Sequence, residues 1–173
     1  KLEYAEEIIV YKNKDDLKNL WAPELHIIDN KCYIYVACDD GKNENHRMYV
    51  LYNNTDNPLV EYKNYGIISD KSNKWAIDGT ILNFKNQLYF IWSGCDKDIH
   101  FKQEIFIAKM KNPFLISGEK VLLSSPEYSW EKQGGDGKNL PFVNEGPAVL
   151  YINEKIYLFF SASGCWCKDY CLG

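Results

Sequence analysis

The chain has 173 residues, a formal net charge of −4 and an aromatic content of 15 %, with 13 Tyr and 5 Trp. This length suits one domain with a buried core. The scattered Lys and Arg exclude the basic surface typical of nucleic-acid-binding proteins, and no apolar run approaches the roughly 18 residues that span a bilayer. We therefore expect no nucleic-acid partner and no membrane partner. The aromatic content favours β structure and is typical of carbohydrate-binding surfaces, because flat rings stack on apolar sugar faces.

The chain opens KLEYAEE, which lacks the basic segment and apolar stretch of a signal peptide. This opening fits a cytoplasmic protein, a processed mature form or a chain that starts within a domain. The localisation, secreted or cytoplasmic, therefore stays open.

Short apolar and alternating stretches between turn residues predict many strands. In chain order, the expected strands are 7–11, 25–28, 32–38, 47–52, 66–69, 80–84, 88–92, 104–109, 120–123, 147–151 and 156–160. Helical periodicity is almost absent, and only 14–20 could form about one turn of helix. Many short, evenly spaced strands indicate a sandwich, a barrel or a propeller.

An internal repeat favours the propeller. The stretches WAPE (21–24), WAID (75–78) and NEGP (144–147) each lead into an apolar strand, a tight turn and an aromatic strand. The acidic residues Glu24, Asp78 and Glu145 take the same place in each unit, 54 and then 67 residues apart. A period of this size, with about four strands per unit, is typical of propeller blades. Because the innermost strand of each blade starts near one mouth of the central channel, these carboxylates should converge around the axis.

Six cysteines leave the redox compartment open. Cys32 and Cys38 fall inside an expected strand, where a lone thiol is usually a small hydrophobe. Cys165, Cys167 and Cys171 could form a metal or disulfide site, but they lack a C-x-x-C pair and a second cluster with zinc-type spacing. We therefore expect apolar packing, and no metal ligand, from these cysteines.

Longer motifs carry a resemblance to a known family. In order along the chain, WAPELH, WAIDGTIL, LYFIWSG, QEIFIAKMKNPFLISGEKVLLSSPEYSWE, VNEGPAVL, FFSASGCW and DYCLG resemble glycoside hydrolase family 43. The resemblance implies an all-β fold, a five-bladed β-propeller of which this chain would hold two complete blades and parts of two others. The implied segments are 1–12 as a remnant of blade 1, 21–70 as blade 2, 75–125 as blade 3 and 143–173 as the start of blade 4.

The resemblance also implies roles for two carboxylates. Glu145 in VNEGP would be the general acid that protonates the leaving oxygen, and Asp78 in WAIDGT would orient this acid and raise its pKa. The family inverts configuration, which requires a third carboxylate as general base. That base is an Asp, usually in an Arg-Asp-Pro context, and the acids among the first 20 residues lack this context. We therefore assign no general base to this chain and expect the fragment by itself to be inactive.

Four further residues are candidates for binding the substrate, namely Trp21, Glu24, Trp75 and Trp166. Each tryptophan could instead pack between blades. Glu24 could be a residue at the rim of the channel that holds the start of its blade by hydrogen bonds.

Other polar and aromatic residues are harder to assign. His26 and the stretch 45–47 are expected to contact the fold rather than a ligand. Trp130 and Glu131 lie in a long Gly-rich connection, 127–139, which could shape substrate subsites or project into solvent.

Within the family, the resemblance is closest to exo-acting α-L-arabinofuranosidases. It implies hydrolysis of terminal α-L-arabinofuranosyl units from arabinan, arabinoxylan or derived oligosaccharides, by an inverting acid/base mechanism. It implies no cofactor, although a His beyond this chain could hold an ion in the central channel. The alternatives are a β-xylosidase of the same family, which shares these motifs, and a non-catalytic carbohydrate-binding propeller.

Overall fold

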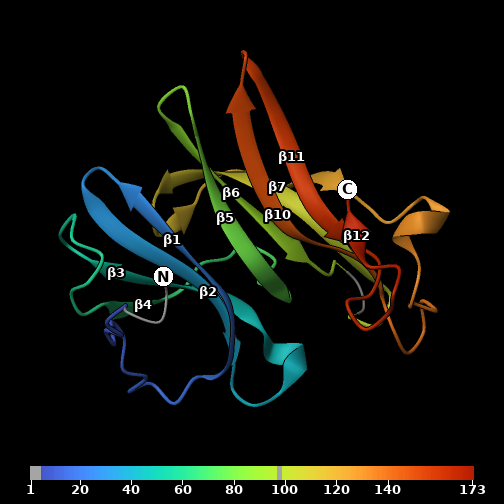
Figure 1. Ribbon diagram of the computed structural model, residues 1–173, viewed down its shortest axis with the longest axis horizontal. Helices are drawn as coiled ribbons and strands as arrows, with labels where there is room; N and C mark the ends of the chain where they lie inside the picture. Colours follow the sequence, from blue (N-terminus) through green and yellow to red (C-terminus); the bar gives the residue numbers. More distant parts are fainter. Residues whose placement is uncertain (1–4, 97–98) are drawn as a thin grey trace.

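Three β-hairpins form the frame of the fold. The computed structural model describes residues 5–96 and 99–173 of the chain. The hairpins are antiparallel pairs: β1 (Lys18–Ile28) with β2 (Lys31–Asp39), β5 (Ala76–Phe84) with β6 (Gln87–Gly94), and β10 (Phe142–Ile152) with β11 (Lys155–Ala162). Figure 1 shows them side by side, with β5 between β1 and β10.

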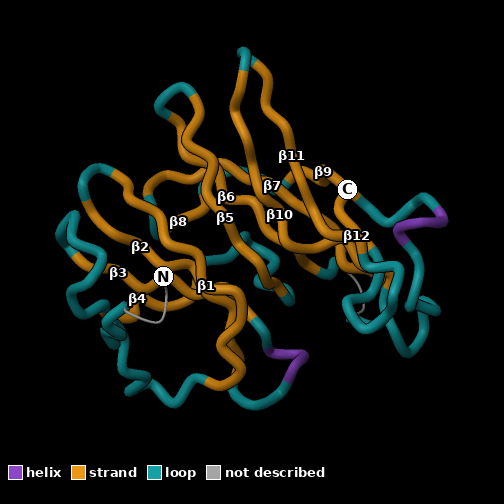
Figure 2. Tube along the Cα trace, in the orientation of Figure 1, coloured by secondary structure: helices purple, strands orange, loops and turns teal. Residues whose placement is uncertain are grey.

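The remaining elements complete two four-stranded sheets and begin a third. They are β3 (Arg47–Asn53), β4 (Lys63–Ile67), β7 (Lys102–Asn112), β8 (Leu115–Ile116), β9 (Val121–Ser124), β12 (Cys171–Leu172) and the 3₁₀ turns η2 (Asn43–Asn45) and η3 (Ser129–Glu131). The first sheet has the order β1-β2-β3-β4, and the second has β5-β6-β7-β9, with β8 also paired to β7. A short parallel pairing of β7 with β10 joins the second sheet to β10-β11-β12. Figure 2 shows both 3₁₀ turns at the edge of the molecule.

Each hairpin closes through two residues with positive φ. These pairs are Asp29 and Asn30, Lys85 and Asn86, and Asn153 and Glu154. Two consecutive residues of this kind form a type I′ turn, whose twist matches the twist of the flanking strands. The three hairpins therefore have the same register relative to their turns.

Each hairpin also carries a β-bulge at the same distance from its turn. Three residue steps on the first strand oppose two on the second, from Trp21 to Glu24, from Ile77 to Thr80 and from Glu145 to Ala148. The second residue of each bulged stretch has positive φ: Ala22 at 42°, Asp78 at 53° and Gly146 at 59°. A bulge bends its strand and re-aims the side chains beside it.

The bulges correct the alignment of the repeats that the sequence indicated. Counted from bulge and turn, Glu24 corresponds to Thr80, and Glu145 corresponds to Ile77. The prediction that Glu24, Asp78 and Glu145 take the same place in each unit was therefore wrong. It matched residue types along the chain, whereas the turn and the bulge set the register of a hairpin.

The two complete sheets pack against each other around one apolar cluster. Strands β2 and β3 supply residues of this cluster from the first sheet, and strands β6 and β7 supply residues from the second. Tyr35 and Phe90 are among its largest fully buried side chains, with ring centroids 5.6 Å apart. The hydroxyl of Tyr35 donates a hydrogen bond to the Pro113 carbonyl, which satisfies this buried polar group.

Two local predictions near the start of the chain were wrong. The stretch 14–20 forms no helix, because the side chain of Asn13 bonds both backbone groups of Leu17, and Asp16 has a positive φ. The stretch 7–11 forms no strand, and the Val10 carbonyl accepts a backbone hydrogen bond from Tyr62. Every expected strand from 25–28 onward overlaps an observed strand. In the described part of the chain, no helix has the length and apolar character that crossing a bilayer requires.

The type I′ turn of the third hairpin gives a test of this frame. Glu154 occupies its second position at a φ of 60°, where a glycine avoids the steric cost of a side chain. We expect Glu154→Gly to raise the free energy of unfolding by about 0.5–1 kcal/mol, measured by urea denaturation of the full-length protein. Glu154→Ala is the matched control, since it keeps the steric cost. Equal stability of the two variants would contradict this turn assignment.

Candidate active site

The bulged ends of β1, β5 and β10 open into one cavity of about 940 Å³. All six site residues expected from the sequence line it, namely Trp21, Glu24, Trp75, Asp78, Glu145 and Trp166. The rest of the lining comes from neighbouring residues of the three strands, from Asn43, and from the segments 99–103, 139–141 and 165–170. The expectation that the three carboxylates converge is therefore confirmed, although they occupy different places in their hairpins.

Asp78 lies in the bulge of β5 and bridges to the next hairpin. Its Oδ2 accepts a hydrogen bond of 2.9 Å from the backbone N–H of Gly146, which occupies the corresponding bulge of β10. A Cβ on the following residue, Gly79, would lie 2.4 Å from Cζ of Phe90 and 2.8 Å from Cε of Met48. The Asp-Gly pair therefore combines a carboxylate aimed across the hairpins with a backbone pressed onto the core.

Glu145 is half-buried, and its Oε1 accepts a 3.0 Å hydrogen bond from the Tyr170 hydroxyl. Burial and the nearby charge of Asp78 raise the pKa of Glu145 to about 7, and the Tyr170 hydrogen bond acts in the opposite direction. A carboxyl group with this pKa carries a proton for part of the time at neutral pH. It can therefore donate a proton near neutrality, which a carboxyl in water cannot do.

A line of carboxylates runs from Glu24 through Asp78 to Glu145. Burial raises the pKa of Asp78, the Gly146 N–H opposes this shift, and the charge of Glu24 adds to it. Asp78 in turn raises the pKa of Glu145. The charge of Glu24 therefore makes Asp78 harder to ionise, and the charge of Asp78 does the same to Glu145.

Glu24 connects the first two hairpins. Its Oε1 accepts a 2.8 Å hydrogen bond from Oγ1 of Thr80 and lies 3.1 Å from Nε2 of His26. Burial alone would raise the pKa of Glu24, but the contacts with His26 and Thr80 outweigh burial and lower it. Glu24 therefore stays negatively charged, and its contacts match the alternative in which it holds the start of its blade.

The three cavity tryptophans differ in what they expose. Trp21 is 42 % exposed and Trp166 is 48 % exposed, so both offer ring surface to a ligand. Trp75 is only 6 % exposed and belongs to the cluster between the sheets. Most of the Trp75 side chain is therefore packed between the sheets, and only part of it reaches the cavity.

Asn144, the residue before Glu145, is held by three hydrogen bonds. Asn144 is fully buried, and its Nδ2 donates to Oγ of Ser124 and to Oε1 of Glu131, while its carbonyl accepts from Oγ of Ser93. Glu131 is itself 3 % exposed, and its other oxygen accepts two backbone N–H groups of the loop. Glu131 is thus a buried anchor, so the alternative in which the connection 127–139 only projects into solvent does not hold for this residue.

Some functional neighbours were not found from the sequence. Tyr170, which donates to Glu145, and Thr80, which donates to Glu24, carry no spacing signal, because tertiary folding alone brings them to the acids. Cys165 also lines the cavity. Among the described residues no disulfide is formed, and Cys32 and Cys38 are buried in β2 as expected. Within residues 5–96 and 99–173, no three His, Cys, Asp or Glu side chains are grouped as a metal site would require.

Comparison with known proteins identifies the family of this arrangement. A model of the glycosyl hydrolases family 43 matches residues 2–173. The chain belongs to glycosyl hydrolases family 43. The solved members that it resembles have the five-bladed β-propeller fold, so its two complete four-stranded sheets are propeller blades. The division into blade segments 1–12, 21–70, 75–125 and 143–173 stays a prediction.

Individual family 43 relatives are similar along nearly the whole chain. "Alpha-L-arabinofuranosidase 43" of Humicola insolens is 34 % identical over 99 % of this chain and 35 % of its own length. An extracellular exo-α-(1→5)-L-arabinofuranosidase of Streptomyces avermitilis is 36 % identical over 90 % of this chain and 31 % of its own length. The crystal structure of an α-L-arabinofuranosidase from Lactobacillus brevis superposes with a TM-score of 0.80 at 34 % identity, over 89 % of this chain and 48 % of that one. The chain thus spans about a third to a half of the length of these proteins.

The raised pKa of Glu145 predicts a pH-dependent stability effect. Folding raises this pKa from 4.5 to about 7, so the group lowers the free energy of unfolding above pH 7 and has no effect below pH 4.5, where both states are protonated. The cost is at most about 3 kcal/mol, and solvent screening reduces it. We expect Glu145→Gln to raise the Tm of the full-length protein at pH 8 and to leave it unchanged at pH 4. A Tm gain of the same size at both pH values would contradict the assigned environment of Glu145.

Proposed function

We propose that the full-length protein is an exo-acting α-L-arabinofuranosidase that removes terminal arabinofuranosyl units from arabinan, arabinoxylan or derived oligosaccharides. The observation that carries this proposal is the half-buried Glu145, whose pKa is raised to about 7 beside Asp78 in an aromatic-lined cavity. The names of the similar proteins support arabinofuranosides as the substrate class.

The roles of the two acids follow from their surroundings. Glu145, protonated near neutral pH, donates its proton to the glycosidic oxygen as the bond to the sugar breaks. Asp78 keeps the proton on Glu145 through its charge, and its hydrogen bond to Gly146 N–H fixes the backbone next to the acid. Inversion also requires a base that activates water on the opposite face of the sugar. We assign that base to no residue of this chain.

The cavity surfaces suit a sugar ring. The exposed faces of Trp21 and Trp166 can stack on the apolar face of a furanose, and the charged Glu24 can accept hydrogen bonds from its hydroxyl groups. Trp75 also lines the cavity, with little of its side chain exposed. These four residues form the proposed substrate-binding set.

A direct test compares aryl α-L-arabinofuranoside with aryl β-D-xyloside as substrates of the full-length protein. We expect faster hydrolysis of the arabinofuranoside. Preference for the xyloside would identify a β-xylosidase of the same family. Sugar binding without turnover of either substrate would favour a carbohydrate-binding propeller.

The acid role of Glu145 has a kinetic signature. Glu145→Gln should lose about 10²–10⁴-fold in kcat on natural oligosaccharides, whose leaving groups need a proton. Aryl glycosides with activated leaving groups should lose much less, because their departure needs little protonation. Glu154→Gln, the same change at the exposed tip of the same hairpin, is the matched control. An equal loss on both substrate types would remove Glu145 from the acid role.

The role of Asp78 appears in the pH profile. Activity requires protonated Glu145, so kcat/KM should fall as pH rises through about 7. Asp78→Asn removes a negative charge that raises the pKa of Glu145, so the alkaline limb should move to lower pH. Asp56→Asn, at an exposed turn of the first sheet, serves as the control and should leave the limb in place. An unmoved limb in Asp78→Asn would exclude the electrostatic role.

A further inference from the structure

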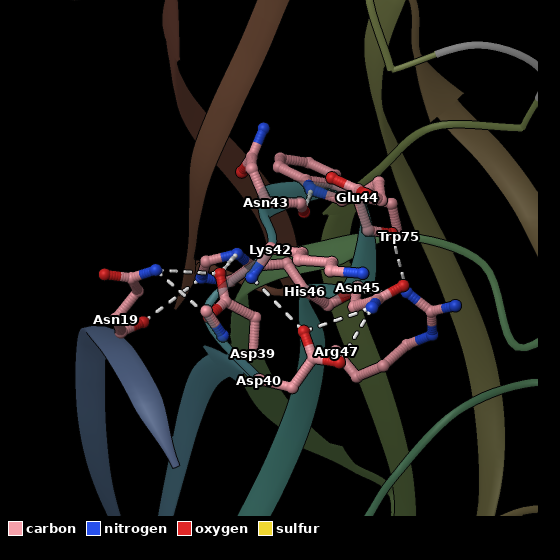
Figure 3. A network of polar contacts seen from close by, with 11 residues as sticks. Asn19, Asp39, Asp40, Lys42, Asn43, Glu44, Asn45, His46, Arg47 and Trp75 are labelled. Carbon is pink, nitrogen blue, oxygen red and sulfur yellow. Dashed lines mark hydrogen bonds and ion pairs between the residues drawn. The ribbon is translucent and has the colours of Figure 1, made fainter.

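A buried polar cluster lies behind one wall of the cavity, and the mechanism above makes no use of it. We define the His46 cluster as Asn19, Asp39 and His46, whose side chains turn toward one another in Figure 3. The side chains of Asp39 and His46 are fully buried. Burying polar groups is costly, so a cluster of this kind calls for a reason.

The imidazole of His46 is fixed in its own plane. Its Nδ1 lies 2.8 Å from Oδ2 of Asp39, in a close polar contact, and its Nε2 lies 3.1 Å from the Asn19 carbonyl oxygen, within hydrogen-bond distance. Asp39 is held in turn, since its two oxygens accept 3.0 Å hydrogen bonds from Nδ2 of Asn19 and its Oδ1 accepts the Gly41 N–H at 2.7 Å. With a polar partner at each nitrogen, the ring cannot rotate without losing one of them.

This fixed ring carries Trp21 on its face. The centroids of Trp21 and His46 lie 4.0 Å apart with 26° between the ring planes, which is a stacked pair. Trp21 also lines the cavity, and the residue is 42 % exposed. Trp21 is therefore backed by one aromatic ring and still offers exposed surface to the cavity.

Trp21 lies in an irregular part of the β1–β2 ladder. The β1–β2 ladder is irregular on both sides of Trp21, between Lys18 and Trp21 and between Trp21 and Glu24. Asn19 and Ala22 both have positive φ. Its pairing with Ala37 is thus isolated between two irregularities, and the stack on His46 adds a second constraint on the side chain.

The segment between β2 and β3, which contains His46, also contacts Trp75. The indole Nε1 of Trp75 donates to the Asn43 carbonyl at 2.8 Å, and the His46 carbonyl accepts the Ala76 N–H at 3.3 Å. The ring of His46 lies 6.2 Å from that of Trp75, tilted by 54°. The segment between β2 and β3 therefore supports both tryptophans of this wall.

We propose that His46 and Asp39 are positioning residues that hold the indole of Trp21 as a stacking face for the sugar bound beside Glu145. This role rests on the proposed function, because it assigns a sugar to that face. His46 and Asp39 act on affinity through Trp21 and take no part in proton transfer.

The kinetic test separates affinity from chemistry in the full-length protein. His46→Gln should raise KM for aryl α-L-arabinofuranoside about three- to tenfold, the size expected for a lost ring contact, with kcat nearly unchanged. If Trp21→Ala is already present, His46→Gln should add no further increase, since both changes remove the same contact. An equal factor in both backgrounds, or a loss in kcat without a change in KM, would overturn the proposal.

Matched variants guard against simple misfolding. Asp39→Asn keeps the shape of the side chain and should raise KM in the same direction, so it replaces His46→Gln if that variant does not fold. Asp40→Asn makes the same change in the next residue, whose carboxylate bonds Asn45 and the Lys42 N–H outside the cluster. It should leave KM unchanged, and an increase equal to that of Asp39→Asn would overturn the proposal.

A second readout needs no activity. The acrylamide quenching due to Trp21 is the difference in tryptophan fluorescence quenching between the parent and Trp21→Phe. It should increase in the His46→Gln background, because the unstacked ring is more accessible. If the parent protein hydrolyses no arabinofuranoside, the proposed function fails, and quenching still decides the positioning role. Unchanged quenching by Trp21 would overturn that role.

Discussion

The hydrogen bond from Gly146 N–H to Oδ2 of Asp78 is the contact on which the site depends. It joins the bulge of one hairpin to the bulge of the next, so it fixes two blades relative to each other at the mouth of the cavity. It also holds a negative charge beside the residue that follows Glu145. This one bond therefore contributes to both the position and the pKa of Glu145, together with burial and the Tyr170 hydrogen bond.

Two carboxylates of the cavity, Asp78 and Glu145, lie in surroundings that disfavour their charged form. Burial opposes ionisation of both Asp78 and Glu145, and each is further opposed by the charge of a neighbour. Glu24 is the exception, because Thr80 and His26 stabilise its charge. Glu24 therefore stays charged, whereas Glu145 carries a proton for part of the time at neutral pH. Asn144, Glu131 and the core beneath Gly79 supply the rigidity that keeps such an arrangement from relaxing.

Much of this could be predicted from the sequence, for physical reasons. Strands with alternating or aromatic patterns are local features, and each expected strand from 25–28 onward was found. The two-residue strands β8 and β12 were missed, because only their pairing with a distant strand defines them. The helix at 14–20 failed, because the Asn13 side chain captures the backbone of Leu17.

The sequence predicted which residues line the cavity, but not which positions of the three hairpins correspond to one another. Glu145 and Asp78 reached the same cavity as expected, and so did the three tryptophans. The correspondence of the acids between hairpins was wrong, because it was aligned on residue types, whereas each acid lies at a different distance from the turn of its hairpin. Tyr170 and His46 were not predicted as parts of the site. Only tertiary folding brings Tyr170 to Glu145 and His46 to Trp21.

The shared bulge has a consequence for how such a protein changes over time. Three hairpins offer the same backbone frame at their inner ends, yet the frame holds Trp21 in one, Ile77 in another and Glu145 in the third. The chemical character of this position in each hairpin therefore depends on the side chain and not on the path of the backbone. A single substitution at this position can therefore replace an aromatic ring by a carboxyl group, or the reverse, without a change of backbone frame.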